Sequence, residues 1–206
     1  MNKLHLASTG NRHKREIAMT FDDGPNPYFT SKILEILDDF NVGATFFVIG
    51  QRCIEYPEIL KEIQKRQHLI GNHTFTHRKG DFKICEQIIN QITGNTVKYV
   101  RPPYYDLNFC IDEAEFLQNK IVITGEVDPK DYLPISENEL LENVLAKINN
   151  GSIIDFHDGS EIDFDLNTRS SKTIKILPKI ISTLVKMKYN LVRIDSMSLE
   201  IGDIYI

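Results

Sequence analysis

Two adjacent aspartates, Asp22 and Asp23, are the first residues along the chain whose types and spacing could do chemistry. They lie in the segment Thr20–Pro25, after a short apolar run that predicts a strand. Adjacent side chains that leave a strand point to different sides, so one carboxylate can bind a metal ion while the other stays free as a base. Asp-Gly-Pro is also ordinary turn chemistry. The segment alone therefore fits an acid-rich turn as well as a catalytic pair.

Two histidines four residues apart, His73 and His77, are the second candidate. If this segment turns helically, both imidazoles face the same direction and can chelate one ion. Histidines at this spacing are often surface or packing residues, and it is the aspartate pair that favours a metal site. One carboxylate, from Asp23, and two imidazoles leave positions open for water and substrate, which is typical of a catalytic metal. Zinc is the expected ion, although Co²⁺, Ni²⁺, Mn²⁺ and Fe²⁺ suit the same ligands.

Arg101 and His157 extend this set of polar residues. Arg101 begins the run Arg-Pro-Pro-Tyr, in which the prolines fix the backbone. Its guanidinium could pair with the free aspartate and keep that carboxylate ionised, or it could be a surface charge beside a rigid loop. His157 follows a buried run into a turn, and it is either a core histidine or a general acid.

Short apolar runs that predict strands alternate along the chain with amphipathic runs that predict helices. The predicted strands are Glu16–Phe21, Ala44–Ile49, His68–Asn72, Lys98–Arg101, Ile121–Gly125, Ser152–Phe156 and Leu191–Ile194. The predicted helices are Ser31–Phe40, Pro57–Arg66, Phe82–Ile92, Asn108–Asn119, Glu137–Ile148 and Lys172–Lys186. This order predicts parallel β/α units, in either a barrel-like or a doubly wound sheet. No linker or repeat interrupts it, so a single domain over residues 1–206 is expected.

The candidate polar residues share one position, the end of a predicted strand. In chain order these strand ends carry Asp22 and Asp23, His73, Arg101, Asp128 and His157. The carboxyl ends of parallel strands meet on one face of a β/α architecture, where active sites form. The sequence therefore predicts one site on that face.

The charge of the chain argues against one functional class, nucleic-acid binding. A net charge of −5 with scattered basic residues argues against a nucleic-acid surface. The most basic stretch, Asn11–Arg15, lies before the first predicted strand and is expected to be a solvated lead-in.

The cysteines and the N-terminus bear on location. Cys53, Cys85 and Cys110 are far apart and outside any CxxC pattern, which predicts free thiols in a reducing compartment. The N-terminus lacks the roughly 7–15-residue apolar core of a signal peptide, and no stretch approaches the roughly 18 apolar residues of a membrane span. A cytoplasmic protein without a transmembrane segment is expected.

Taken together, these segments resemble the ordered motifs of the polysaccharide deacetylase family, the NodB homology domain of carbohydrate esterase family four. The motif TFDDGP matches without change at Thr20–Pro25, H-[ST]-x-x-H matches at His73–His77, and R-x-P-[YF] matches at Arg101–Tyr104. The resemblance extends from about Glu16 to Ile194. It implies a distorted (β/α) barrel, usually with fewer than eight units, in agreement with about seven predicted parallel βα units.

The resemblance also implies roles for these residues. It implies a divalent metal ion bound by Asp23, His73 and His77. Asp22 would be the general base, paired with Arg101, and the backbone N–H of Tyr104 would help to stabilise the oxyanion.

Two motifs depart from the family pattern. The motif D-x-x-D-W reads Asp128 to Tyr132 here, so that Asp131 would tune the acid histidine while Tyr132 gives a smaller aromatic wall than tryptophan. The motif L-x-H reads Asp155-Phe156-His157, so the acid His157 is kept and the leucine that lines the acetyl-methyl pocket is lost.

Asp155 should point where His157 points, because residues two apart on a strand face the same way. An unpaired carboxylate against a methyl group would cost on the order of a few kcal/mol. We therefore expect either an acyl pocket that takes a smaller or more polar group, or a partner for Asp155 elsewhere in the site.

The expected function is metal-dependent hydrolysis of N-acyl groups, chiefly N-acetyl, on amino sugars in an oligo- or polysaccharide or a sugar precursor. An O-acetyl esterase or a non-carbohydrate amidase with the same metal site is an alternative. A catalytically silent carbohydrate-binding relative is another, although such proteins usually lose a base or a ligand that this chain retains.

Overall fold

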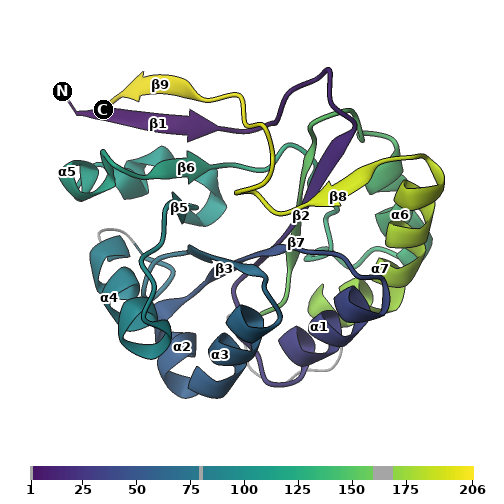
Figure 1. The fold of residues 1–206 in the computed structure, drawn as a ribbon, viewed down its shortest axis with the longest axis horizontal. Coiled ribbons are helices and arrows are strands. Elements are labelled where there is room, and N and C mark those ends of the chain that lie inside the picture. Colours follow the sequence, from purple (N-terminus) through teal and green to yellow (C-terminus); the bar gives the residue numbers. More distant parts are fainter. Residues whose placement is uncertain (1, 79–80, 160–168) are drawn as a thin grey trace.

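One curled, mostly parallel sheet forms the framework of the computed structural model, which describes residues 2–78, 81–159 and 169–206 (Figure 1). The strands run in the order β7-β2-β3-β4-β5-β6-β1-β9, and β8 pairs with β2. Their bounds are β1 Lys3–Ala7, β2 Glu16–Asp22, β3 Thr45–Val48, β4 Leu69–Asn72, β5 Tyr99–Val100, β6 Ile121–Ile123, β7 Ile153–His157, β8 Asn190–Val192 and β9 Gly202–Tyr205. The predicted barrel-like α/β fold is confirmed.

Helices follow the strands and lie on the outside of the curled sheet (Figure 1). They are α1 Phe29–Asp39, α2 Gly50–Glu55, α3 Pro57–Lys65, α4 Phe82–Thr93, α5 Ala114–Leu117, α6 Glu137–Leu145 and α7 Arg169–Lys186. Each longer helix turns an apolar stripe to the sheet; in α1 this stripe includes the buried Ile33, Leu34 and Leu37. Among the described residues, no helix has both the length and the apolar character needed to cross a membrane.

Strand register brings the first and last segments of the predicted site together. β2 and β7 pair in parallel, with Asp22 opposite His157 and Thr20 opposite Asp155. A parallel bridge between Val127 and Ile154 brings the segment after β6 against β7. The sheet therefore curls far enough for residues from both halves of the chain to face one another.

Three parts of the sequence prediction differ from the structure. The sequence analysis missed β1, β9 and the short helix α2. The residues of β1 alternate between polar and apolar, which is a strand signal that was overlooked, and β1 pairs with β6 on one side and with β9 on the other. Asn11–Arg15 is therefore no lead-in, because it connects β1 to β2. Arg12 within it donates to the Asn150 carbonyl at 2.8 Å and pairs with Glu126.

The predicted helix Asn108–Asn119 is also wrong in detail. The chain there forms a 3₁₀ turn at Leu107–Cys110 and then α5. The Asp106 side chain accepts from the Asn108 N–H and starts the 3₁₀ turn. The Glu113 carboxylate accepts from the Lys83 N–H at the start of α4, at 2.9 Å. The Asp106 contact is local and competes with a continuous helix, whereas the Glu113 contact holds the chain against the start of α4.

Gly71 in β4 packs closely against the Phe47 ring, which lies against the Arg101 side chain. A Cβ atom at this position would lie 2.4 Å from the Phe47 ring, and that ring carries the Arg101 guanidinium at 4.1 Å. We expect Gly71→Ala to lower the free energy of unfolding by about 1–3 kcal/mol through overpacking. Urea denaturation would measure it, with Gly202→Ala as the matched control, since no atom lies within 4 Å of that added Cβ. Equal losses in both variants would contradict this packing account.

Candidate metal centre and catalytic pocket

A cavity of about 350 Å³ opens at the carboxyl ends of the strands. Its lining residues come from β2, β7 and the loops after β4, β5 and β6: Asp22, Asp23, His73, His77, Pro102, Tyr104, Tyr105, Asp128, Tyr132, Asp155 and His157. The predicted site residues thus gather in one cavity, except Arg101 and Asp131, which lie fully buried behind it.

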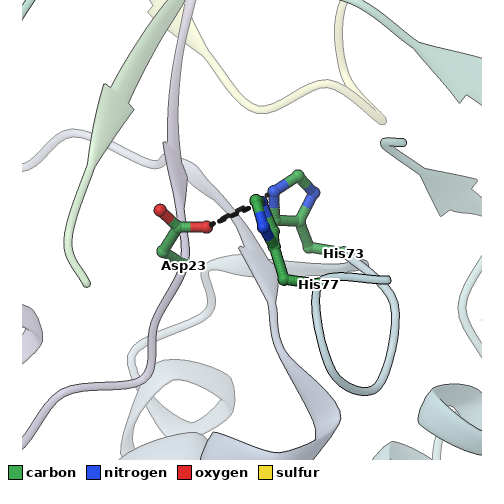
Figure 2. Close-up of side chains that lie close together, drawn as sticks. All are labelled: Asp23, His73 and His77. Carbon is green, nitrogen blue, oxygen red and sulfur yellow. Dashed lines mark ion pairs between the residues drawn. The ribbon is translucent and has the colours of Figure 1, made fainter. Parts of the chain in front are cut away.

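Asp23, His73 and His77 converge on one point of this cavity (Figure 2). One candidate ligand atom from each lies within 4.8 Å of the others. The Asp23 Oδ1 atom is 3.5 Å from the Nε2 atom of each histidine. Figure 2 shows the carboxylate facing the two imidazoles across a small gap. One carboxylate oxygen and two imidazole nitrogens form a donor set that suits a divalent transition-metal ion.

Hydrogen bonding orients His73 for this purpose. Its Nδ1 atom lies 2.8 Å from the carbonyl oxygen of Arg101, an acceptor, so Nδ1 carries the proton and donates. The lone pair of Nε2 is then directed toward Asp23. A second hydrogen bond of this kind fixes the tautomer and raises the basicity of histidine ligands in metal sites. The residues present therefore fit a metal ion.

The segment His73–His77 is not helical. The sequence analysis suggested that a helical turn would bring the two imidazoles together, but a different backbone conformation does so here. The backbone of this segment forms bends in which Thr74 (φ 70°) and His77 (φ 61°) are left-handed. Such angles are uncommon for residues with a Cβ and persist only when neighbouring contacts hold them.

Two residues that the sequence analysis missed supply those contacts. The Asn72 side chain accepts from the Thr74 N–H at 2.9 Å. The buried Asp81 carboxylate accepts from the N–H groups of Phe75 and Thr76, each at 3.0 Å. An acidic residue a few positions after a histidine pair is a weak sequence signal, because only the folded loop shows that its two oxygens face backbone donors.

Asp158 fixes the other ligand-bearing turn. Its Oδ1 atom accepts from the Gly24 N–H at 3.1 Å, and its Oδ2 atom accepts from the Thr30 hydroxyl. A Cβ at Gly24 would lie 2.3 Å from Asp158, so this close approach requires glycine. Asp23, just before it, is left-handed (φ 75°). Asp158 was missed as well, although it directly follows His157.

Arg101 links the strands beneath the cavity. Its side chain is fully buried, and Nη1 donates to Asp22 at 2.7 Å, to Asp155 at 2.7 Å and to the Thr20 hydroxyl at 2.8 Å. Arg101 therefore contacts the candidate base and the carboxylate that the sequence left without a partner.

At Asp22, the effect of burial on the pKa is larger than the effect of the ion pair with Arg101. Burial raises the pKa of the Asp22 carboxyl to about 7, the Arg101 charge acts to lower it, and the Asp155 charge acts to raise it further. Arg101 thus favours the ionised form of Asp22, as expected from their pairing, but does not by itself offset the burial. A cation bound by the adjacent Asp23 would lower this pKa. A carboxyl with a pKa near neutral suits a general base.

Asp155 has two partners. Besides Arg101, its carboxylate accepts from the Tyr105 hydroxyl. A Cβ at position 125 would lie 2.2 Å from that hydroxyl, so Gly125 provides the space for Tyr105 to reach Asp155. Of the two alternatives raised for Asp155, the structure therefore supplies the partner, and Tyr105 was missed because nothing local in the sequence pairs it with position 155.

His157 is held by Asp131. Its Nδ1 atom lies 2.8 Å from Asp131 Oδ1, its backbone N–H donates to Oδ2 at 2.9 Å, and the Thr173 hydroxyl also donates to Oδ2 at 2.8 Å. Burial by itself would lower the pKa of His157, but the Asp131 carboxylate outweighs it and holds that pKa well above 6.5. The pKa of Asp131 is lowered by the same pairing in spite of its burial. The pairing therefore favours the protonated form of His157, which is the form that a general acid needs.

Two tyrosines lie at the mouth of the cavity. Tyr104 is 73% exposed and stands edge-on to His77, with ring centroids 4.9 Å apart. Tyr132 is 43% exposed, stands edge-on to His157 and donates to Asp128 at 2.8 Å. Both predicted aromatic positions therefore border the entrance, one beside the metal ligands and one beside the acid.

The chain is similar in sequence to known proteins. The family model described as "Polysaccharide deacetylase" matches residues 9–115. A peptidoglycan-N-acetylglucosamine deacetylase from Bacillus cereus is 35% identical over 164 residues, which cover 75% of this chain and 60% of that protein. A chitooligosaccharide deacetylase from Sinorhizobium fredii is 30% identical over 184 residues, covering 82% of this chain and 85% of the relative.

The fold is also similar to solved structures. A crystal structure of a peptidoglycan N-acetylglucosamine deacetylase in complex with 4-naphthalen-1-yl-N-oxidanyl-benzamide aligns with a TM-score of 0.84 at 31% identity, covering 93% of this chain and 92% of that one. The chain spans less than two thirds of the length of the Bacillus cereus relative described above.

The contact between Asp131 and His157 makes a direct prediction. In Asp131→Asn, the burial of the imidazole is offset only by the charges of the Asp155 and Asp23 carboxylates, so the pKa of His157 should fall. An NMR pH titration of the His157 ring would measure it, with Asp128→Asn as the control that removes a neighbouring carboxylate. An unchanged pKa in Asp131→Asn, or an equal drop in both variants, would contradict the pairing.

Proposed function

Because the chain belongs to the polysaccharide deacetylase family, we propose that it is a metal-dependent hydrolase that removes N-acyl groups, chiefly N-acetyl, from amino sugars in glycans. Residues 1–206 act as a single catalytic domain in this proposal. The observation that carries it is the convergence of a candidate metal site, a base and an acid in one cavity. The relatives' substrates, peptidoglycan and chitooligosaccharide, favour glycans that contain N-acetylglucosamine.

Asp23, His73 and His77 would hold the ion, and Zn²⁺ fits their donor atoms best. When bound, such an ion polarises an acyl carbonyl and lowers the pKa of its water from 15.7 toward about 7.

The remaining residues divide the proton transfers between them. Asp22, whose carboxylate faces the metal ligands, removes the proton from the attacking water. The backbone N–H of Tyr104 donates to the developing oxyanion. His157 then protonates the sugar nitrogen as the C–N bond breaks, since an unprotonated amine is a very poor leaving group. Asp22 and His157 are register partners on the paired strands β2 and β7, and both line the cavity.

The mouth of the cavity favours a sugar. Tyr104 and Tyr132 present exposed aromatic surface on its two sides, and pyranose rings carry apolar C–H faces that pack against such surfaces. The Asp128 carboxylate between them can accept hydrogen bonds from sugar hydroxyls.

An acetate-release assay tests this function. Zinc-loaded protein should release acetate from an N-acetylglucosamine oligomer faster than from an O-acetylated glycan. Asp22→Asn should lower kcat by about 100-fold or more with little change in KM, because it removes the base but not the sugar contacts. Asp39→Asn, an exposed carboxylate at the end of α1, is the matched control and should leave kcat unchanged.

The outcomes separate the alternatives. Faster release from the O-acetylated glycan would make the chain an esterase. Release from neither substrate by correctly folded, metal-loaded protein would contradict the proposed function and favour a silent carbohydrate-binding relative.

A further inference from the structure

The inner wall of the catalytic cavity is set by Asp155. On β7 it lies two residues before His157 and therefore faces the same side. On the paired strand β2, Asp22 is opposite His157 and Thr20 is opposite Asp155. The candidate base and acid thus lie at one level, and Asp155 lies one step deeper. Its side chain is about one tenth exposed and belongs to the cavity lining.

The contacts of Asp155 show that this carboxylate is built into the site. One oxygen accepts from the buried Arg101 and the other accepts from Tyr105. Tyr105 reaches it from a left-handed backbone position (φ 57°), through space that only a glycine at position 125 leaves open. Three separated segments therefore combine to hold a charged group at the bottom of the cavity.

This carboxylate keeps hydrogen-bonding capacity toward the cavity. A carboxylate has about four acceptor sites on its two oxygens. Among the described residues, Arg101 and Tyr105 are the hydrogen-bond donors that the structure gives Asp155. Its exposed edge can accept from a group that enters the cavity.

The acyl end of a substrate is the part that meets this wall. The sugar is on the nitrogen side of the amide and must stay at the mouth, between Tyr104 and Tyr132. In the proposed function, Asp22 and His157 act on the scissile amide, so its carbonyl would lie at their level. Its acyl substituent is on the opposite side of the carbonyl from the sugar and therefore points inward, to Asp155.

Resting on the proposed function, we propose that Asp155 determines acyl specificity by raising activity toward N-hydroxyacetyl (N-glycolyl) groups relative to N-acetyl groups. The terminal hydroxyl of a glycolyl group would donate to the exposed edge of the Asp155 carboxylate, whereas the methyl of an acetyl group would cover that edge without making a hydrogen bond to it. The reaction is an ordinary hydrolysis. The amide C–N bond breaks, a C–O bond to water forms, glycolate departs, and the sugar nitrogen takes the proton.

The experiment compares kcat/KM for matched N-glycolyl and N-acetyl glucosamine oligomers in wild type and in Asp155→Leu. The glycolyl-to-acetyl ratio should be at least about tenfold higher in wild type, which corresponds to one hydrogen bond to a charged group. Asp155→Asn, which keeps an acceptor oxygen, should lie between them. Asp128→Asn, which changes another cavity carboxylate, should leave the ratio at its wild-type value even where the overall rate falls.

A binding measurement makes the test independent of turnover. Calorimetry of glycolate and acetate with zinc-loaded protein should give a glycolate-to-acetate affinity ratio about tenfold higher in wild type than in Asp155→Leu. Glycolate can also chelate the zinc ion, but this contribution to its affinity is the same in wild type and in Asp155→Leu and therefore does not affect the comparison of the two ratios.

Ratios that are equal in wild type and Asp155→Leu would overturn the specificity role. Failure to hydrolyse either oligomer would instead contradict the proposed function, and the calorimetric ratio would still decide the role of Asp155. If Asp155→Leu does not fold, the same comparisons with Asp155→Asn decide it.

Discussion

The buried guanidinium of Arg101 is the constraint on which the site depends. A charge removed from water is stable only when it is paired and hydrogen-bonded, and Arg101 meets this requirement with Asp22 and Asp155 from two different strands. Its backbone takes part as well, since its carbonyl orients His73. One residue thus positions the candidate base, the inner wall of the cavity and one metal ligand, and removal of its charge would leave two carboxylates buried without compensation.

The two ligand-bearing turns depend on carboxylates that do not face the metal position. Asp81 holds the loop from His73 to His77, and Asp158 holds the turn after Asp23. Both turns contain left-handed residues, so their geometry is maintained by these contacts and not by intrinsic backbone preference. Hydrogen bonds thus hold the turns where ligands must converge, while the exposed Tyr104 and Tyr132 border the mouth of the cavity.

The sequence predicted the strand–helix order and the shared face because both follow from local periodicity and from the parallel β/α architecture. The family resemblance, the fold and the buried free thiols of Cys53, Cys85 and Cys110 are confirmed. The alternating residues of β1 were an overlooked strand signal, whereas β9 was missed because its stability comes from pairing with a distant partner. Asp81, Asp158 and Tyr105 were missed for a similar reason, since each acts through a contact that only the folded chain creates. The individual roles of the site residues, the identity of the ion and the cytoplasmic location stay predictions.

The central claim is that Asp23, His73 and His77 together bind one divalent ion. Calorimetric titration of metal-stripped protein with Zn²⁺ tests it most directly, using wild type, His77→Ala and His13→Ala, the last of which removes an exposed histidine outside the cavity. The structure predicts one ion per chain in wild type and in His13→Ala, and loss of this binding in His77→Ala. Unchanged stoichiometric binding in His77→Ala, or equal loss in both variants, would contradict it.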